Sequence, residues 1–141
     1  MYQDIITLFN RITVNGADMW YPTILSGVNL NIDRAAMLAK YGAESQDRAA
    51  LFIRYQQKNG KILISGKEWM PPKAWDGREN SITLATDGDF FWAGQWTEGP
   101  VSDGEYRDGF YSWMNKTKDD VYAITSVARY SVIPHFEVMG K

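Results

Sequence analysis

The sequence contains no cysteine among its 141 residues. This absence excludes disulfide bonds, metal sites with thiolate ligands and a catalytic cysteine, and it fits a reducing compartment. The chain also has a single histidine, His135. A metal triad or a histidine-dependent nucleophile would therefore need partners that the sequence offers only weakly.

Long apolar runs and a basic amino-terminal region are missing as well. Asp4 stands where a secretory signal would carry basic residues, and no apolar stretch is long enough to span a bilayer. The net charge is −2, whereas dedicated nucleic-acid-binding modules usually present a basic surface. We therefore expect a protein kept in the cytoplasm, with no membrane partner and no sequence-specific nucleic-acid partner.

The composition is that of a globular domain. Hydrophobic residues make up 45% of the chain, charged residues 23% and aromatic residues 14%. A chain of this length is of ordinary single-domain size and can bury one core. We expect one β-rich domain over residues 1–141, with aromatic-rich packing.

Three segments have the pattern of β-hairpins. Asparagine-glycine pairs, which supply the positive φ angles of tight turns, occur at residues 15–16 and 59–60 between strand-like runs. A third hairpin is predicted over residues 81–96, around the turn at residues 87–88. Pro22 cannot donate a ladder hydrogen bond, so its strand is expected to lie at an edge or to contain a bulge.

The remaining segments complete a mainly β chain. A short helix is predicted for Arg34–Tyr41, and residues 97–109 form the longest loop candidate. Residues 110–118 fit either a strand or a short helix, and two strands follow to the end of the chain. About eight strands at this spacing predict a small antiparallel β-barrel or sandwich with hairpins, a short helix and one long loop.

Several carboxylates lie close to glycines, as they do in calcium-binding loops. They fall into two groups, Asp87 with Asp89 and Asp103 with Glu105 and Asp108. Neither group has the ligand spacing of an EF-hand, and acidic residues beside glycines are also ordinary turn residues. We expect turns, with no metal and no cofactor.

Paired carboxylates for glycoside hydrolysis could be drawn from Glu68, Asp89, Glu98 and Glu105. The six tryptophans would suit a sugar-binding groove, but most of them lie in or beside predicted strands, where aromatic residues are favoured for packing. We assign no catalytic residue and expect a protein that is not an enzyme. A carbohydrate-binding β-module stays open as an alternative, as does a small hydrolase that uses Glu98 or Glu105.

The segments DFFWAGQW and GFYSWM carry more large apolar side chains than one face of a strand can bury. Either some of them point outward and form an interaction patch, or both faces of a central strand are covered. We predict a contact surface in the loop 101–109 and the segment 110–113. Its residues are Val101, Tyr106, Arg107, Phe110, Tyr111 and Trp113.

The closing segment DDVYAITSVARYSVIPHFEVMGK resembles the end of a family of small proteins encoded in prophages of Firmicutes, with its DDVYxITSV strand and terminal xHxEVxGK strand. The opening ITLFNR and WYPTILSGV resemble the first hairpin of that family. KEWMPPKAW and SITLATDGDFFWAG are similar to its proline-lysine segment and its xTLxxGDxxxxG hairpin. The resemblance keeps the same order over most of the chain, except in AMLAKYGAESQDRAA and TEGPVSDGEYRDGF.

This resemblance implies a virion structural protein that is similar to head-closure or head-tail connector (neck) proteins, which are small β-barrels. The implied partners are other neck, portal and tail proteins, together with further copies in a homo-oligomeric ring, although the chain can be monomeric alone. A tail-completion role in the same virion is the alternative. The implied location is the host cytoplasm during assembly and then the virion, and no catalytic residue is implied.

Two further expectations concern the ring and the end of the chain. A mildly negative charge suits a ring through which DNA slides, because a basic lumen would bind phosphates. The last two strands are expected to close the barrel by pairing with earlier hairpins, the first hairpin among the candidates.

Overall fold

The computed structural model describes residues 2–32 and 48–141. The helix predicted for Arg34–Tyr41 lies outside these residues. The fold is mainly β, as the sequence predicted, and of the two predicted architectures, barrel or sandwich, it is a closed barrel. The described part also contains a smaller sheet, one α-helix and one turn of 3₁₀-helix.

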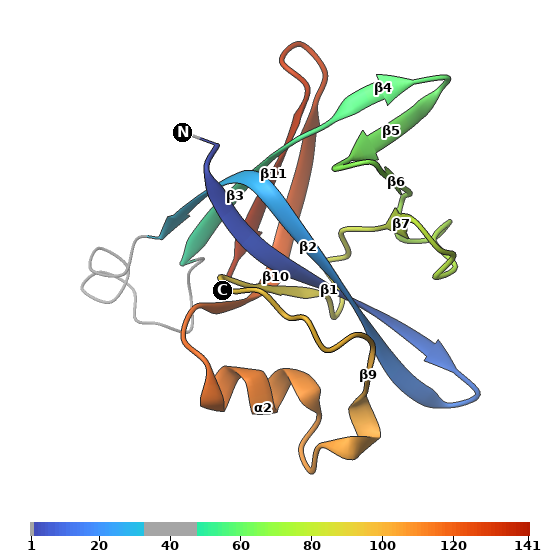
Figure 1. Ribbon diagram of the computed structural model, residues 1–141, viewed down its shortest axis with the longest axis vertical. Helices are drawn as coiled ribbons and strands as arrows, with labels where there is room; N and C mark the ends of the chain where they lie inside the picture. Colours follow the sequence, from blue (N-terminus) through green and yellow to red (C-terminus); the bar gives the residue numbers. More distant parts are fainter. Residues whose placement is uncertain (1, 33–47) are drawn as a thin grey trace.

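Six antiparallel strands form the barrel (Figure 1). Around the barrel they are β1 (Asp4–Val14), β8 (Phe90–Trp92), β10 (Val121–Tyr130), β11 (His135–Gly140), β3 (Ala49–Arg54) and β2 (Ala17–Ile32). The pairing of β2 with β1 closes the circle. A closed barrel leaves no long unpaired edge that could recruit another chain.

The first hairpin forms as predicted. Val14 pairs with Ala17 across a turn in which Asn15 and Gly16 have φ angles of 52° and 78°. Further along, the register skips Gly27, which has a φ of 66°. This bulge bends β2, so that its first part pairs with β1 and its last four residues pair with β3. Barrel closure therefore depends on a bulge at Gly27.

The last two strands, β10 and β11, are part of the barrel wall, between β8 and β3. β10 pairs with β8, and β11 pairs with β3 over six residues. Backbone hydrogen bonds of 2.9 and 3.2 Å between Ala123 and Lys141 extend the β10–β11 pairing to the last residue. In the described residues the terminal pair joins the first hairpin only through β8 and β3, not by direct pairing.

A second, smaller sheet lies beside the barrel. It contains β4 (Gln56–Lys58), β5 (Lys61–Ile64), β6 (Lys67–Trp69) and β7 (Ser81–Ile82). The predicted turn at residues 59–60 joins β4 to β5. The predicted strand before this turn is interrupted at the buried Tyr55, whose N–H donates to the carbonyl of Pro134 at 3.4 Å.

The third predicted hairpin is wrong. Its turn forms at residues 86–88, but β7 pairs with β6 and β8 pairs with β1 and β10. Between β7 and the turn, side chains take the place of a ladder. The amide of Asn10 donates to the carbonyl of Thr83 at 2.7 Å, and Asp89 accepts from the N–H of Ala85 at 3.1 Å. These side-chain hydrogen bonds, and not a ladder with β8, hold residues 83–85 in place.

The segment predicted as one long loop contains β9 (Val101–Ser102), which pairs with β2, and the 3₁₀-helix η1 (Asp103–Glu105). The segment left open between strand and helix is a helix, α2 (Phe110–Thr117). In Figure 1, α2 and η1 lie at one end of the longest axis of the molecule, and the turn between β10 and β11 lies at the other.

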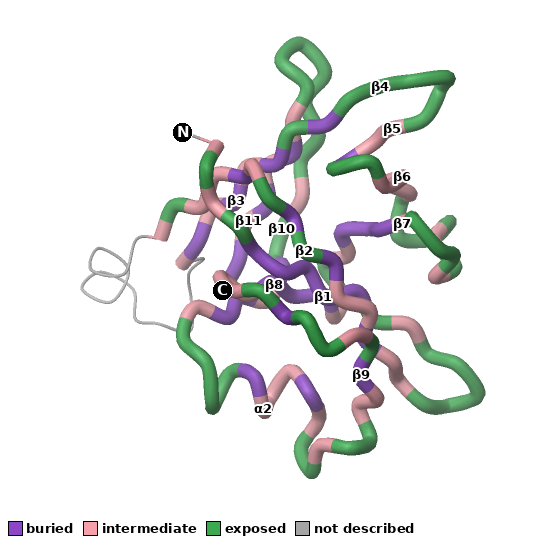
Figure 2. Tube along the Cα trace, viewed as in Figure 1, coloured by how far each residue is buried: buried purple, intermediate pink, exposed green. Residues whose placement is uncertain are grey.

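Buried side chains form two clusters, which Figure 2 shows as purple segments in the barrel strands and in α2. Alternate residues of one strand enter different clusters. Phe91 packs inside the barrel, whereas its neighbour Phe90 packs on the outside with Phe110 of α2. Both faces of β8 are therefore covered, which is the second of the two alternatives left open for the aromatic segments.

Candidate interaction surfaces

The cluster of buried side chains between the outside of the barrel and α2, called here the outer cluster, contains much of the predicted contact surface. Its buried members are Phe9, Trp20, Phe90, Trp96, Val101, Phe110, Met114 and Val121. Of the predicted contact residues, Phe110 has no exposed surface and Val101 is 6% exposed. In this conformation both are packing residues that attach α2 and β9 to the barrel, because no partner can reach buried side chains.

Asp103 fixes the orientation of α2. One of its oxygens, Oδ1, accepts hydrogen bonds from the indole N–H of Trp20 at 2.9 Å and from the backbone N–H of Phe110 at 2.8 Å. A carboxylate at a helix N-terminus satisfies an otherwise unpaired donor and interacts favourably with the helix dipole. Asp103, a calcium candidate in the sequence, thus positions a helix.

The outward side of this region keeps four of the predicted contact residues accessible. Tyr106, Tyr111 and Trp113 are partly exposed and Arg107 is exposed. The aromatic rings of Tyr106 and Trp113 lie 5.0 Å apart. We call Tyr106, Trp113 and the exposed acids Glu98 and Glu105 the helix face.

The acids of the helix face act on Tyr106. Burial, followed by the negative charges of Glu105 and Glu98, raises the pKa of the Tyr106 hydroxyl. This effect indicates that both carboxylates lie near the ring. The helix face therefore combines aromatic surface with negative charge.

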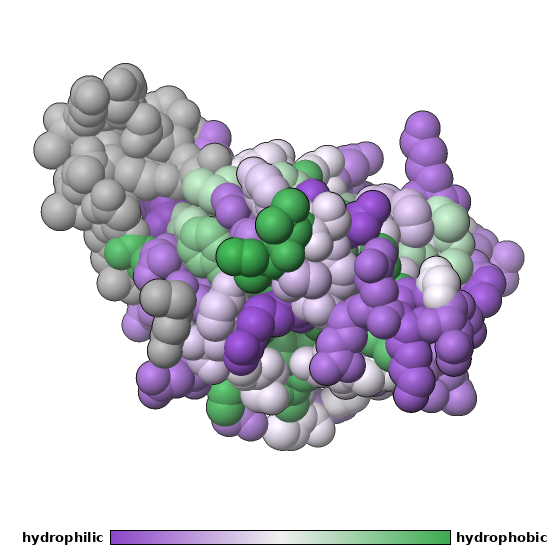
Figure 3. Space-filling view, turned by 90° about the horizontal axis from the view of Figure 1, so that it is seen from above, coloured by the Kyte–Doolittle hydropathy of each residue, from purple (hydrophilic) through white to green (hydrophobic). Residues whose placement is uncertain are grey.

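A second surface lies at the other end of the molecule, in the turn between β10 and β11. We call residues 130–134 the hairpin tip. Val132 is 94% exposed and Ile133 is 73% exposed, the highest values among the exposed large hydrophobic residues, and Tyr130 and Pro134 are exposed beside them. Figure 3, which looks onto this end, shows a compact hydrophobic group among hydrophilic neighbours. Sequence reasoning missed this surface.

His135 holds the hairpin tip in shape. Its Nδ1 lies 2.6 Å from the carbonyl oxygen of Ile133 and its Nε2 lies 2.9 Å from Oε2 of Glu137. The ring also stacks on Tyr130, with centroids 5.0 Å apart. Two acceptors favour the imidazolium form, in which both nitrogens donate, so Glu137 and then the Ile133 carbonyl raise the pKa of His135. The tip is thus a fixed apolar projection beside a basic side chain.

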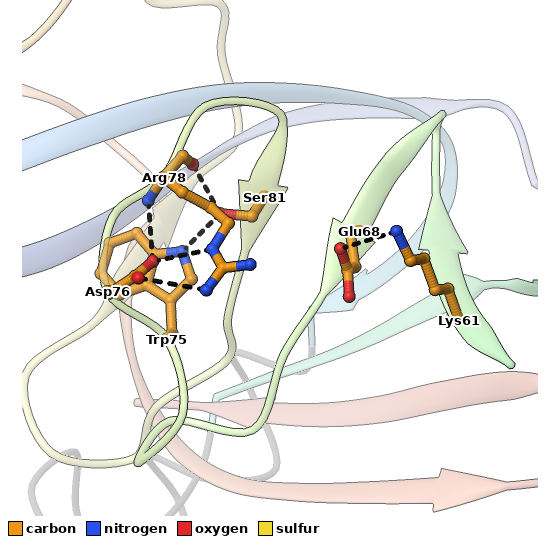
Figure 4. A network of polar contacts seen from close by, with 6 residues as sticks. All are labelled: Lys61, Glu68, Trp75, Asp76, Arg78 and Ser81. Atoms are coloured by element: carbon orange, nitrogen blue, oxygen red, sulfur yellow. Dashed lines mark hydrogen bonds and ion pairs between the residues drawn. The ribbon is translucent and has the colours of Figure 1, made fainter.

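Two of the four hydrolase candidates, Glu68 and Asp89, are engaged in contacts within the fold. Glu68 lies in β6 and forms an ion pair with Lys61, with 3.8 Å between Nζ and Oε1 (Figure 4). Asp89 is buried within the fold, whereas Glu98 and Glu105 are exposed beside Tyr106. Glycoside hydrolysis requires two carboxylates across one bond.

Two of the six tryptophans, Trp20 and Trp96, are buried, and the other four are partly buried. Trp75, in the loop between β6 and β7, donates its indole N–H to Ser81 Oγ at 3.1 Å (Figure 4). In the same loop Arg78 holds Asp76 through bonds of 3.0 and 3.1 Å, which lowers the pKa of Asp76. These contacts hold the loop between β6 and β7, which contains the proline-lysine segment, in its conformation.

Asp89 is the one strongly perturbed carboxyl group that the described residues show. Its oxygens accept hydrogen bonds from Asn10 Nδ2 at 2.7 Å and from the backbone N–H groups of Arg11 and Ala85 at 2.9 and 3.1 Å. These donors favour the carboxylate, but burial has the larger effect and raises the pKa of Asp89 from 3.8 to about 6. The Asp89 carboxyl group therefore connects β1 to the segment 83–89 by hydrogen bonds.

We expect Asp89→Asn to change how stability depends on pH. Folded wild type holds the Asp89 proton more tightly than the unfolded chain, so ionisation lowers wild-type stability as pH rises from 3.8 to about 6. A two-unit difference corresponds to about 3 kcal/mol. The asparagine variant lacks this change, and at any pH its NH₂ group faces an N–H donor, which costs about 1–3 kcal/mol.

Urea unfolding of both proteins between pH 4 and 7 measures this effect. The variant should be the less stable at the acid end, and its stability relative to wild type should rise by about 3 kcal/mol with rising pH, so that the gap between the two proteins closes or changes sign. Other titrating groups cancel in the comparison. A gap that stays constant with pH would contradict the assignment.

In residues 2–32 and 48–141, no group of three or more histidine, aspartate or glutamate side chains could hold a metal ion. Over the same described ranges, no helix is long and apolar enough to cross a membrane.

Comparison with known proteins identifies the family. A model of the family of unknown function DUF6751 matches residues 1–141. The chain belongs to this family. No curated protein and no solved structure matches it significantly.

Proposed function

We propose that this member of DUF6751 is a non-enzymatic structural protein of a phage virion, a head-tail connector that acts by ring assembly at the neck. The observation that carries the proposal is a closed barrel with two different surfaces at opposite ends of the longest axis of the molecule, the exposed aliphatic hairpin tip and the helix face with its partly exposed aromatic rings. A rigid body with two different contact surfaces is what a cyclic assembly requires, because each subunit must meet two neighbours.

The chemistry of the described residues supports a role in contacts. Of the carboxylates considered for hydrolysis, Glu68 is engaged in an ion pair, Asp89 is buried in the fold, and Glu98 and Glu105 are exposed. The resemblance of the terminal strands to prophage proteins is the basis for proposing a virion protein located at the neck. It is also the basis for the proposed partners, which are portal and tail proteins together with further copies of this chain. On this proposal the protein is present in the host cytoplasm during assembly and then in the virion.

The test is a quantitative mass-spectrometric count of the protein in purified phage particles induced from the source bacterium. Amounts are scaled to the portal and major capsid proteins of the same particles. We expect a copy number equal to that of the portal ring. Absence from mature particles would exclude the virion role. A copy number well below that of the portal would instead favour the tail-completion alternative.

A further inference from the structure

We infer that the hairpin tip of one copy docks on the helix face of a second copy, in a head-to-tail contact. This inference deepens the proposed function, because it names the contact on which ring assembly would rest. The argument uses the exposure of the tip, the charges at the two ends and the place of both surfaces in the fold.

The first step is the exposure of apolar side chains where a turn would normally be polar. Val132 and Ile133 are 94% and 73% exposed. Turns favour glycine, asparagine, aspartate and serine, whereas this one presents two adjacent β-branched side chains and a proline. Two contacts hold the backbone of the tip. The hydroxyl of Tyr55 donates to the carbonyl of Tyr130 at 2.8 Å, and the ring of His135 contacts the carbonyl of Ile133. A rigid apolar projection loses little conformational entropy on binding.

The second step is the charge around the tip. Residues 54–67 carry four lysines and arginines and no carboxylate. Ile133 and Pro134 line a groove together with Arg54 and Leu63 of this segment, so one of its four cations borders the apolar tip. Arg129 and His135 flank the tip within the β10–β11 hairpin. This end of the molecule is apolar at its point, with the cations Arg54 and Arg129 near it, whereas Lys61 and His135 are paired with Glu68 and Glu137.

The third step is the opposite character of the other end. Residues 97–120 carry six carboxylates and three lysines or arginines. Within them the helix face offers the partly exposed rings of Tyr106 and Trp113, with Glu98 and Glu105 beside them. Aromatic surface suits an aliphatic projection, and the acids suit the cations around it. The two ends complement each other, which points to a second copy of this chain.

The fourth step is geometry. The tip and the helix face lie at opposite ends of the longest axis (Figure 1). A contact between two different surfaces repeats head to tail, and it closes into a ring only if each step turns the chain. Nearly opposite surfaces give a small turn at each step. The contact therefore produces a ring or an open filament and not a closed two-fold dimer.

The absence of cysteine provides a direct test, since an introduced thiol is the only one in the chain. Ser131→Cys places it on the tip, beside an unaltered Val132 and Ile133. Gly104→Cys places it next to Glu105, where a Cβ would meet only the Ser102 hydroxyl at 4.0 Å. Ala17→Cys, on the exposed turn of the first hairpin, is the matched control.

The purified single-cysteine proteins are mixed in pairs and oxidised. We expect the 131–104 disulfide to form faster than either homodimer and faster than any product with the Ala17→Cys control. Predominance of the 131–131 product would indicate contact between two tips and would overturn the inference. So would a 131–104 yield no higher than that of the control.

Sedimentation equilibrium of the cysteine-free chain supplies a second measurement. The average mass of wild type should rise with protein concentration and fall with salt. A double substitution, Val132→Asp with Ile133→Asp, should weaken association at least about tenfold. The exposed Val14 lies beside the turn of the first hairpin, outside both proposed contact surfaces, so Val14→Asp should associate as wild type does. Equal association of all three proteins would contradict the docking.

Failure of this inference is distinguishable from failure of the proposed function. If the protein is present in particles at the copy number of the portal but the 131–104 disulfide does not form, the virion role stands and the tip contact is wrong. If the disulfide forms but particles lack the protein, the contact stands and the virion role is wrong.

Discussion

A chain that ends at Val132 is expected to lose cooperative folding. The truncation removes residues 133–141 and with them all of β11, which pairs with β10 on one side and β3 on the other. It also removes the fully buried side chains of Phe136 and Val138 from the barrel core. Two neighbouring strands would then expose unpaired edges, which promote aggregation.

The expected loss exceeds what a small domain tolerates. Deleting a large buried side chain costs about 2–5 kcal/mol, and the backbone pairing of β11 is lost in addition. Native domains are stable by only about 5–15 kcal/mol. The truncated chain should therefore show no native far-ultraviolet spectrum and no cooperative unfolding transition.

Circular dichroism and urea unfolding of the truncated chain test this expectation. The matched control is full-length Ile133→Ser, which alters the exposed tip and leaves β11 in place; it should unfold as wild type does. A synthetic peptide of residues 133–141 added to the truncated chain should restore some native signal. A cooperative transition in the truncated chain alone would show that β11 is dispensable.

Turns were the features best predicted from the sequence, because their chemistry is local. The asparagine-glycine pairs at 15–16 and 59–60 form tight turns since these residues adopt positive φ angles. Gly27 also adopts a positive φ, yet no local pattern marked it as the bulge that lets β2 pair with both β1 and β3. A barrel or sandwich was predicted, but the position where the strand bends to close the barrel was not.

The third hairpin shows where local prediction fails. The turn at residues 86–88 is present, but Asn10 and Asp89 supply side-chain hydrogen bonds to Thr83 and Ala85 in place of a ladder. Asn10 lies 73 residues from Thr83 in the chain. A buried amide so far away in sequence cannot be recognised from the segment itself.

The contact surfaces were predicted unevenly for a similar reason. The aromatic segment 110–113 was recognised, but whether Phe110 points toward the barrel depends on the covered outer face of β8. The apolar run at residues 132–134 was counted as part of the closing strands. A signal was available, because two antiparallel strands near the chain end need a turn between them and residues 131–134 are the ones that supply it.

Phe110→Ala is expected to destabilise the protein by about 3–5 kcal/mol, the usual cost of removing a buried phenylalanine ring. Phe110 is fully buried. Its ring centre lies 5.1 to 6.2 Å from those of six other aromatic residues. Its backbone N–H also donates to Asp103 Oδ1, the hydrogen bond that orients α2. The ring therefore attaches the helix, and with it the helix face, to the barrel.

Arg107→Ala is the matched control, because Arg107 was predicted in the same contact surface and its side chain is exposed. Its loss should change the free energy of unfolding by less than about 0.5 kcal/mol. Urea unfolding followed by tryptophan fluorescence measures both variants, since Trp20, Trp96 and Trp113 lie around the altered ring. A small effect of Phe110→Ala, equal to that of Arg107→Ala, would mean that α2 is not packed on the barrel. The helix face would then be no fixed surface, and the docking of the hairpin tip would lose its support.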